Sequence, residues 1–299
     1  MKLAPPAALA LLGLLVAPAF AAPAPKPRLT PPMSELLAAA PASEWRPIAQ
    51  DRLLYLQTAR GLVLIELAPD FAPKHVDNIR RLIAAGVFDH VAIVRAQDNF
   101  VVQWGVPDAD PKPPLGSAQA KLAGEFTRSA KGLAFTPMPD RDAYAPQVGF
   151  ASGFPAARDP KTGRAWLIHC YGSVGVARDN APDTGNGSEL YAAIGPARRL
   201  DRNLTVVGRV VQGMEILAVT PRGHEANGFL RPADVIPVKL RLGSDLPASE
   251  QASLQALRTD SPTFARAAEG RRNRRDAFYA TPQGGVDVCD VALPVRPKP

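Results

Sequence analysis

The chain alternates between short apolar runs and turn-forming residues, a pattern typical of a protein built mainly from β-strands. The first pair of runs, within residues 53–67, is interrupted by turn residues at 58–61 and predicts a hairpin. Later runs that are each long enough for one strand span residues 90–96, 100–104, 190–194, 205–210 and 236–242. Many short strands with few helices favour a closed antiparallel barrel.

Two segments have helical spacing instead. Pro73 suits the first turn of a helix that carries an apolar stripe over residues 76–83 and can end at Gly86. Met214 begins a second, short helix that Pro221 should end. The pattern therefore predicts a mainly β domain with two helices.

The first 22 residues have the pattern of a secretory signal peptide. Lys2 precedes an apolar stretch over residues 9–16, and the small-residue site at 19–21 follows it. The stretch is too short to span a membrane, and no later run is longer, so no transmembrane segment is expected. We expect an exported, periplasmic protein that is cleaved near residue 22.

The formal net charge is +7, and loss of Lys2 with the signal segment would reduce it to +6. Part of the basic excess lies in residues 271–275, which could form a nucleic-acid-binding patch or a solvated helix face. Aromatic residues for base stacking are not interleaved there. The solvated face is favoured, and no nucleic-acid partner is expected.

Two cysteines, Cys170 and Cys289, could form one disulfide in an oxidising compartment. Two buried free thiols remain the alternative, because a sequence cannot show whether their Cα atoms come within about 7 Å. The four histidines lack any paired metal-ligand spacing. No metal and no cofactor are expected.

The run around Arg95 places one cation and one amide, Gln103, among apolar side chains. If two strands meet there, period-2 alternation predicts Phe100 and Val102 on one face and Val101 with Gln103 on the other. A guanidinium beside an apolar patch suits a prolyl peptide, which is apolar yet offers one atom to a hydrogen-bond donor. The alternative is an exposed strand arginine lying over a hydrophobic edge.

The spacing Arg95-x4-Phe100-x2-Gln103-x-Gly105 resembles the F-H-R-x4-F-x2-Q-G-G signature of the cyclophilin-type peptidyl-prolyl isomerases. Five more segments resemble family motifs in the family's order: residues 61–67, 72–79, 175–178, 186–191 and 200–214. The resemblance implies a mainly β fold, a closed eight-stranded antiparallel barrel capped by two helices.

The resemblance also implies roles for individual residues. Arg95 would stabilise the twisted X-Pro amide, and Gln103 would orient Arg95 or hold the substrate backbone. The implied substrate-binding positions are Phe100, Val101, Ala177, Arg178, Tyr191, Arg199, Leu200 and Leu204. The expected partners are proline-containing unfolded or extended polypeptides, and a monomer is expected.

Several positions depart from the family pattern. Val101 replaces the usual Met, Tyr191 the usual Phe, Arg199 a common Trp, Leu204 a His, and Glu189-Leu190 a Gln-Phe pair. Because Arg95 and Gln103 are retained, we predict a peptidyl-prolyl isomerase of reduced activity that acts on exported proteins. The alternatives are a weak or inactive proline-peptide binding module or envelope chaperone, and a purely structural periplasmic protein.

Three regions have no counterpart in the minimal family pattern. An N-terminal extension over residues 23–52 and a C-terminal extension over residues 245–299 flank the isomerase-like domain, residues 53–244. A long insertion, residues 127–172, interrupts that domain and is of a length usually tied to function or to packing of its own. The disulfide would pin the C-terminal extension onto the insertion.

Parts of both extensions have local patterns. Residues 34–40 have the pattern of a small helix. Leu254 and Leu257 are spaced as on a helix, and residues 286–293 have the pattern of a strand.

Overall fold

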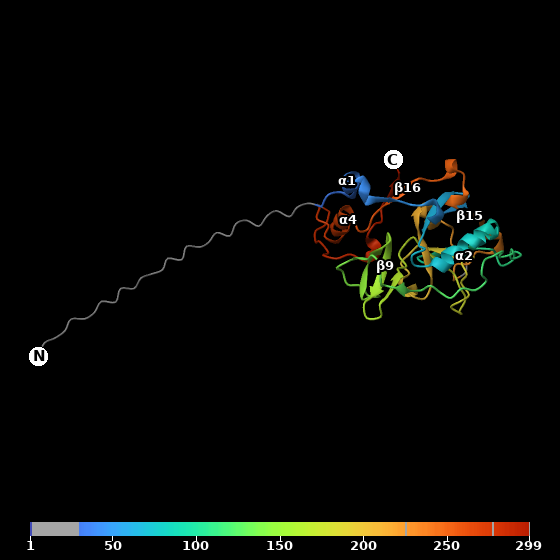
Figure 1. Ribbon diagram of the computed structural model, residues 1–299, viewed down its shortest axis with the longest axis horizontal. Coiled ribbons are helices and arrows are strands. Elements are labelled where there is room, and N and C mark those ends of the chain that lie inside the picture. The colour runs from blue at the N-terminus through green and yellow to red at the C-terminus, as the bar shows by residue number, and fades with distance from the viewer. Residues whose placement is uncertain (2–29, 225, 277, 299) are drawn as a thin grey trace.

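The computed structural model describes residue 1 and residues 30–224, 226–276 and 278–298. Apart from Met1, the expected signal segment lies outside the described residues. Among these residues, three antiparallel sheets of nine, five and three strands make up the β-structure. Figure 1 shows how the elements are arranged. Within the described ranges, no helix combines the length and the apolar character that a membrane crossing needs.

The largest sheet forms the barrel, with the strand order β14-β4-β5-β12-β11-β13-β3-β2-β15. Its strands are β2 (Leu53–Thr58), β3 (Gly61–Leu67), β4 (Ala92–Gln97), β5 (Val101–Gly105), β11 (Ser173–Val176), β12 (Leu190–Ala193), β13 (Val206–Gln212), β14 (Ile236–Pro237) and β15 (Lys239–Leu242). All of its pairings are antiparallel, and its strands follow the apolar runs that alternation predicted, except β11, which lies in none of those runs.

The two edge strands of this sheet are consecutive in the chain. Only Val238 separates β14, which pairs with β4, from β15, which pairs with β2. The Val238 N–H donates to the carbonyl of Val91 at 3.1 Å, so pairing continues across the junction. Residues 236–242 therefore close the barrel, which has the expected eight strands if this run is counted once.

Two helices cap the barrel, α2 (Pro73–Ala84) and α3 (Met214–Ala218), both close to the predicted bounds. The N-terminus of α2 is capped from a distance, because the Glu125 carboxylate accepts the backbone N–H groups of Lys74 (3.2 Å) and His75 (2.9 Å). Gly86 follows the C-terminus at φ +76°, the left-handed conformation that glycine adopts without strain.

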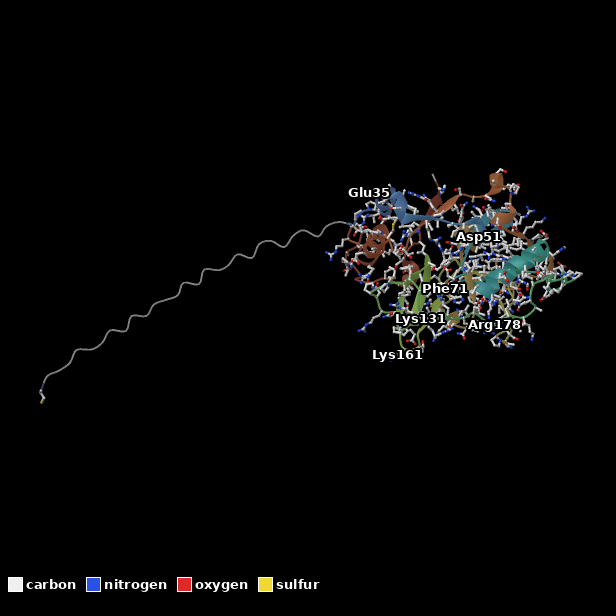
Figure 2. All side chains as sticks on the ribbon, viewed as in Figure 1. Glu35, Asp51, Phe71, Lys131, Lys161 and Arg178 are labelled. Atoms are coloured by element: carbon white, nitrogen blue, oxygen red, sulfur yellow. A yellow bond between two sulfur atoms is a disulfide. The ribbon has the colours of Figure 1, made fainter. Side chains whose placement is uncertain are left out.

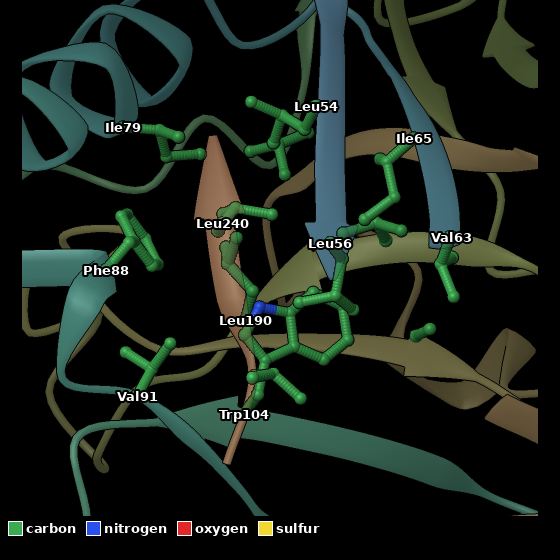
Figure 3. Close-up of a cluster of buried hydrophobic side chains, with 14 of the residues drawn as sticks. Leu54, Leu56, Val63, Ile65, Ile79, Phe88, Val91, Trp104, Leu190 and Leu240 are labelled. Carbon is green, nitrogen blue, oxygen red and sulfur yellow. The ribbon is translucent and has the colours of Figure 1, made fainter. Parts of the chain in front are cut away.

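The barrel interior is one apolar core to which every strand contributes. Trp104 is fully buried at its centre, close to Leu56, Leu190 and Leu240 (Figure 3), and Ile79 closes it from α2. Each large side chain buried this way stabilises the fold by about 1.5–3 kcal/mol relative to exposure.

The insertion forms its own five-stranded sheet, in the order β6-β10-β9-β8-β7. Its strands are β6 (Arg128–Ser129), β7 (Thr136–Pro137), β8 (Gln147–Ala151), β9 (Phe154–Asp159) and β10 (Arg164–Leu167). Alternation gives this sheet two apolar faces. Phe154 and Leu167 pack with Val206 of the barrel, while Phe150 and Trp166 pack with the C-terminal extension.

Both extensions meet in the three-stranded sheet, where β16 (Leu254–Leu257) lies between β1 (Trp45–Pro47) and β17 (Val295–Pro297). Helix α1 (Met33–Ala38), at the predicted position, packs on α4 (Pro262–Arg272) (Figure 1).

The helical interpretation of Leu254 and Leu257 was wrong. All four residues of β16 are buried, because Leu254 and Ala256 pack in the cluster with Tyr55 and Leu257 packs in the cluster with Phe264. A strand that is covered on both faces loses the period-2 pattern. The strand expected over residues 286–293 is also absent from that described stretch, which instead contains a short 3₁₀ turn over Val288–Asp290.

Cys170 and Cys289 form a disulfide with their Cα atoms 5.1 Å apart. Cys170 lies just after β10 of the insertion, and Cys289 lies in the 3₁₀ turn of the C-terminal extension. Both contact the apolar cluster that includes Phe264 of α4. The bond therefore joins two regions of the chain that lie outside the barrel.

Replacing both cysteines with alanine should destabilise the protein. The bond joins residues 119 apart, and a closed loop of that length has a chain-entropy value of about 5 kcal/mol, which is an upper estimate. Urea unfolding of the double variant should show a loss of about 2–5 kcal/mol. Wild type in reductant should unfold at a similarly lowered urea concentration, whereas the variant should not respond to reductant; equal stability of both proteins would contradict the expectation.

Candidate functional site

A cavity of about 390 Å³ on one side of the barrel gathers the residues that the sequence singled out. Every expected catalytic or substrate-binding position except Arg199 lines it: Arg95, Phe100, Val101, Gln103, Ala177, Arg178, Tyr191, Leu200 and Leu204. Arg199 lies next to it, with its guanidinium carbon 4.3 Å from the centre of the Phe100 ring. We call this cavity the groove.

A β-bulge determines where Arg95 points. In the β4–β5 pair, the register shifts between Ile93 and Arg95, which leaves Val94 as an extra residue and sets Arg95 opposite Gln103. Bulges are a common device for re-aiming a side chain beside a functional site. Arg95 and Gln103 therefore enter the groove from neighbouring strands.

Three acceptors hold the Arg95 guanidinium. Its Nε donates to the carbonyl of Asn227 (2.6 Å), one terminal nitrogen to Gln97 Oε1 (2.5 Å) and the other to Gln103 Oε1 (3.4 Å). A guanidinium has five N–H groups, so one N–H on each terminal nitrogen has no partner among these bonds. Burial lowers the pKa of Arg95, which Glu189 opposes, but a guanidinium stays charged.

Two aromatic rings flank this guanidinium. Its carbon lies 5.4 Å from the ring centre of Phe100 and 5.3 Å from that of Phe229. Phe229 comes from a segment that runs beside β4, where Ala96 N–H donates to Gly228 O (2.8 Å) and Leu230 N–H to Val94 O (2.9 Å). The sequence did not predict a role for Phe229, because this residue lies outside every motif and every alternating run.

The prediction that Phe100 lies on the opposite face from Val101 and Gln103 was wrong. All three residues line the groove. The strand β5 begins only at Val101, and Asn99 before it has a left-handed conformation at φ +50°. Strict alternation therefore does not extend back through the turn to Phe100.

Glu189 is a second residue that sequence analysis did not assign to the site. Gln103 Nε2 donates to Glu189 Oε1 at 2.6 Å, which leaves the Gln103 carbonyl oxygen facing Arg95. Burial raises the pKa of Glu189, although the bond from Gln103 acts in the opposite direction. The three side chains form one line of hydrogen bonds in which Glu189 fixes the orientation of the Gln103 amide.

Part of the groove wall is apolar, and five polar residues complete it: Asp108, Asp179, Thr184, Asn186 and Ser188. Val101, Leu200 and Leu204 line the groove together with Tyr191, which is only 3% exposed. Leu200 ends a 3₁₀ turn over Arg198–Leu200. These side chains form an apolar slot beside the Arg95 guanidinium.

The segment with Ala177 and Arg178 is already engaged within the protein. The Ala177 N–H donates to the carbonyl of Glu189 at 3.0 Å, so it is not free for a peptide. The Arg178 guanidinium donates to backbone carbonyls of Asp179 (2.6 Å), Asn180 (3.0 Å) and Asn203 (3.1 Å). Arg178 is marked in Figure 2, where Lys131 and Lys161 mark the insertion.

Across the part of the chain that the structure describes, no cluster of three or more histidine, cysteine or acidic side chains could hold a metal ion. The groove offers a fixed cation, an oriented amide and an apolar slot, and two N–H groups of that cation have no partner within the described part of the chain. Such a site can bind an apolar group next to a hydrogen-bond acceptor.

Comparison with known proteins gives consistent matches. The family model for "Cyclophilin type peptidyl-prolyl cis-trans isomerase/CLD" matches residues 53–236. A probable peptidyl-prolyl cis-trans isomerase of Brucella suis is 29% identical over 196 residues, covering 65% of this chain and 84% of that protein. Human peptidyl-prolyl cis-trans isomerase-like 1 is 26% identical over 204 residues, covering 68% of this chain and 96% of that protein.

A solved structure extends the likeness beyond the barrel. The crystal structure of cyclophilin AquaCyp293 from Hirschia baltica aligns with a TM-score of 0.66 and 26% identity. It covers 84% of this chain and 92% of that chain. This share exceeds the 65–68% covered by the two relatives above, so part of the added structure outside the barrel is also similar.

Glu189→Gln should stabilise the protein at neutral pH and retain the bond to Gln103. Because the folded-state pKa of Glu189 is raised, its ionised form opposes folding, and the protein gains relative stability as the pH falls and the carboxylate is protonated. The advantage of the variant should therefore shrink toward about pH 4, near the ordinary pKa of glutamate. Urea unfolding of both proteins at pH 7 and pH 4 measures this difference in the free energy of unfolding.

The exposed Glu250 provides the matched control. Glu250→Gln should show no such pH-dependent difference from wild type. A Glu189→Gln variant that is less stable than wild type at pH 7 would contradict the expectation.

Proposed function

The chain belongs to the cyclophilin-type peptidyl-prolyl cis-trans isomerases, and from that we propose that Arg95 accelerates X-Pro isomerisation by stabilising the twisted amide within the groove. One observation carries this proposal. Three acceptors hold the Arg95 guanidinium beside the apolar slot, and among the described residues no partner uses the second N–H of either terminal nitrogen.

The reaction needs a positioned donor rather than a nucleophile. An amide C–N bond has partial double-bond character, and rotation about it meets a barrier of about 18–20 kcal/mol. When the bond twists, the proline nitrogen becomes pyramidal and its lone pair can accept a hydrogen bond. A donor that reaches this nitrogen only in the twisted state binds the transition state more tightly than either planar isomer.

The surroundings of Arg95 suit this role. Phe100 and Phe229 flank the guanidinium, and a hydrogen bond in such a partly desolvated place is stronger than in water. The guanidinium is held in place by Gln97, Gln103 and the carbonyl of Asn227. Little reorganisation is therefore needed when the amide twists. Lysine could supply the charge but not this fixed, planar arrangement of donors.

The substrates we propose are proline-containing segments of unfolded or extended polypeptides. The proline ring would enter the slot formed by Val101, Tyr191, Leu200 and Leu204, where burial of its apolar surface supplies binding energy. Because the Ala177 N–H is already used, the peptide backbone would meet the carbonyl side of that segment or Gln103.

We place these substrates among exported proteins. Residues 1–22 have the composition of a signal peptide. The disulfide between Cys170 and Cys289 supports the proposal, because such bonds persist in oxidising compartments.

Arg95→Ala should lower kcat/KM for an X-Pro peptide by about 10²–10³-fold, the usual cost of losing one transition-state donor. Arg95→Lys keeps the charge without the planar fork and should recover only part of the loss. Exchange between the cis and trans peptide signals in NMR measures the rate. Arg241→Ala is the matched control, since Arg241 is an exposed residue of β15 outside the groove.

Peptide titration in the same NMR samples distinguishes an enzyme from a binding module. If wild type binds the peptide without accelerating exchange, or if Arg95→Ala is as fast as wild type, the groove is a binding site that lacks this mechanism. If the Arg241→Ala control also loses activity, charge in general rather than the Arg95 donor is responsible.

The export proposal has its own test. The full chain expressed in a bacterium should be recovered from the periplasm with a mass that lacks about the first 22 residues. Protein that stays in the cytoplasm with its full mass would count against it.

A further inference from the structure

Tyr191 differs from the family pattern by one hydroxyl group, and that group points away from solvent. Its oxygen lies 2.8 Å from Nε2 of His169, which is fully buried. The two rings are nearly parallel, 11° apart, with their centres 6.2 Å from each other. Burial, aided by Asp201, raises the pKa of Tyr191 well above its ordinary value, so the phenol keeps its proton.

The Asp201 carboxylate determines which nitrogen of His169 carries hydrogen. Its Oδ1 accepts the backbone N–H of His169 (2.9 Å) and lies 3.0 Å from Nδ1 of the same residue. Because a carboxylate in an ion pair can only accept, Nδ1 is the donor. Nε2 is then the ring nitrogen that faces the Tyr191 hydroxyl, which can donate to it because the phenol keeps its proton.

Arg198 extends this line of contacts to the insertion. Its Nε donates to Asp201 Oδ2 at 2.7 Å, and its two terminal nitrogens donate to both oxygens of Asp142 at 2.8 Å each. The three side chains are at most 5% exposed. Buried charges this well paired hold a fixed geometry, because breaking one contact leaves another charge unpaired. The Tyr144 ring covers the Arg198 guanidinium from outside, with the ring centre 4.8 Å from the guanidinium carbon.

Two parts of the chain contribute to this buried polar network. Tyr191, Arg198 and Asp201 belong to the barrel, whereas His169 and Asp142 belong to the insertion. The network also fastens the turn that carries Arg199 and Leu200, because the His169 carbonyl accepts the N–H of Ala197 at 3.1 Å. Two walls of the groove, the Tyr191 ring and this turn, are therefore tied to the insertion.

We propose that His169 and Asp142 are positioning residues of the groove, through which the insertion fixes the Tyr191 ring for proline binding. This inference rests on the proposed function of the groove. The ring contacts proline in the planar and twisted states alike, so a loosened ring weakens binding of both. Loss of the network should therefore raise KM with little change in kcat, unlike the loss of the Arg95 donor.

Two substitutions each remove one partner of the hydrogen bond between Tyr191 and His169. Tyr191→Phe keeps the ring and removes only the hydroxyl. His169→Asn keeps an N–H donor for Asp201 near the place of Nδ1 and removes the acceptor for Tyr191. Each should raise KM by about two- to tenfold, the usual range for one buried hydrogen bond.

The double variant tests whether the two residues act together. If they act through one bond, the double variant should have the KM of a single variant rather than the product of both effects. Unchanged KM in Tyr191→Phe would overturn the proposal. Multiplying effects, or a fall in kcat with KM unchanged, would overturn it as well.

Asp142→Asn tests the reach of the network from the insertion. It weakens the paired contact to Arg198 and should raise KM in the same direction. Asp159→Asn is the matched control, because Asp159 also lies in the insertion but accepts the N–H of Lys161 instead of pairing with Arg198. The KM of this variant should equal that of wild type. An equal KM in Asp142→Asn and wild type would overturn the role of Asp142.

Circular dichroism shows whether each variant is folded. If Asp142→Asn or His169→Asn fails to fold, Tyr191→Phe decides the outcome, because it removes one atom and keeps the packing. If wild type binds peptide without turnover, the proposed function fails and peptide Kd replaces KM, with the same expected two- to tenfold change. The two failures are therefore distinguishable.

Discussion

The constraint on which the structure depends is closure of the barrel by residues 236–242, which pair with β4 through β14 and with β2 through β15. An open sheet would leave the backbone groups of both edges without partners. Closure also makes β4 an interior strand, held by β5 on one side and by β14 and the Phe229 segment on the other. Arg95 therefore projects from a rigid element, as a precise site requires.

Two lines of hydrogen bonds converge on the groove from opposite sides. One runs from Glu189 through Gln103 to Arg95 and orients the polar wall. The other runs from the insertion to Tyr191 and orients the apolar wall. Both include a residue that departs from the family pattern, Glu189 in one and Tyr191 in the other. These departures are better understood as members of local networks than as isolated losses of family side chains.

Apart from β11, the barrel strands, α2 and α3 could be predicted from sequence because their signals are local: period-2 or helical spacing bounded by turn residues. Arg95 and Gln103 could be identified because the motif that contains them is short and continuous. Phe229 could not, because backbone pairing with β4 brings it to the groove from more than a hundred residues away. Leu254 was assigned to a helix for a related reason, because residues distant in sequence cover both faces of its strand and the strand therefore lacks alternation.

The outer surface of β2 and β3 is apolar, and the two extensions cover it. Leu53, Tyr55 and Leu64 alternate with core residues and so face outward, yet they are almost fully buried against residues of the two extensions. The Tyr55 hydroxyl also accepts the N–H of Ala252 at 2.6 Å. A fragment cut to residues 53–244 would expose this apolar face to water and should self-associate. The extensions thus cover an apolar surface that the barrel by itself would present to solvent.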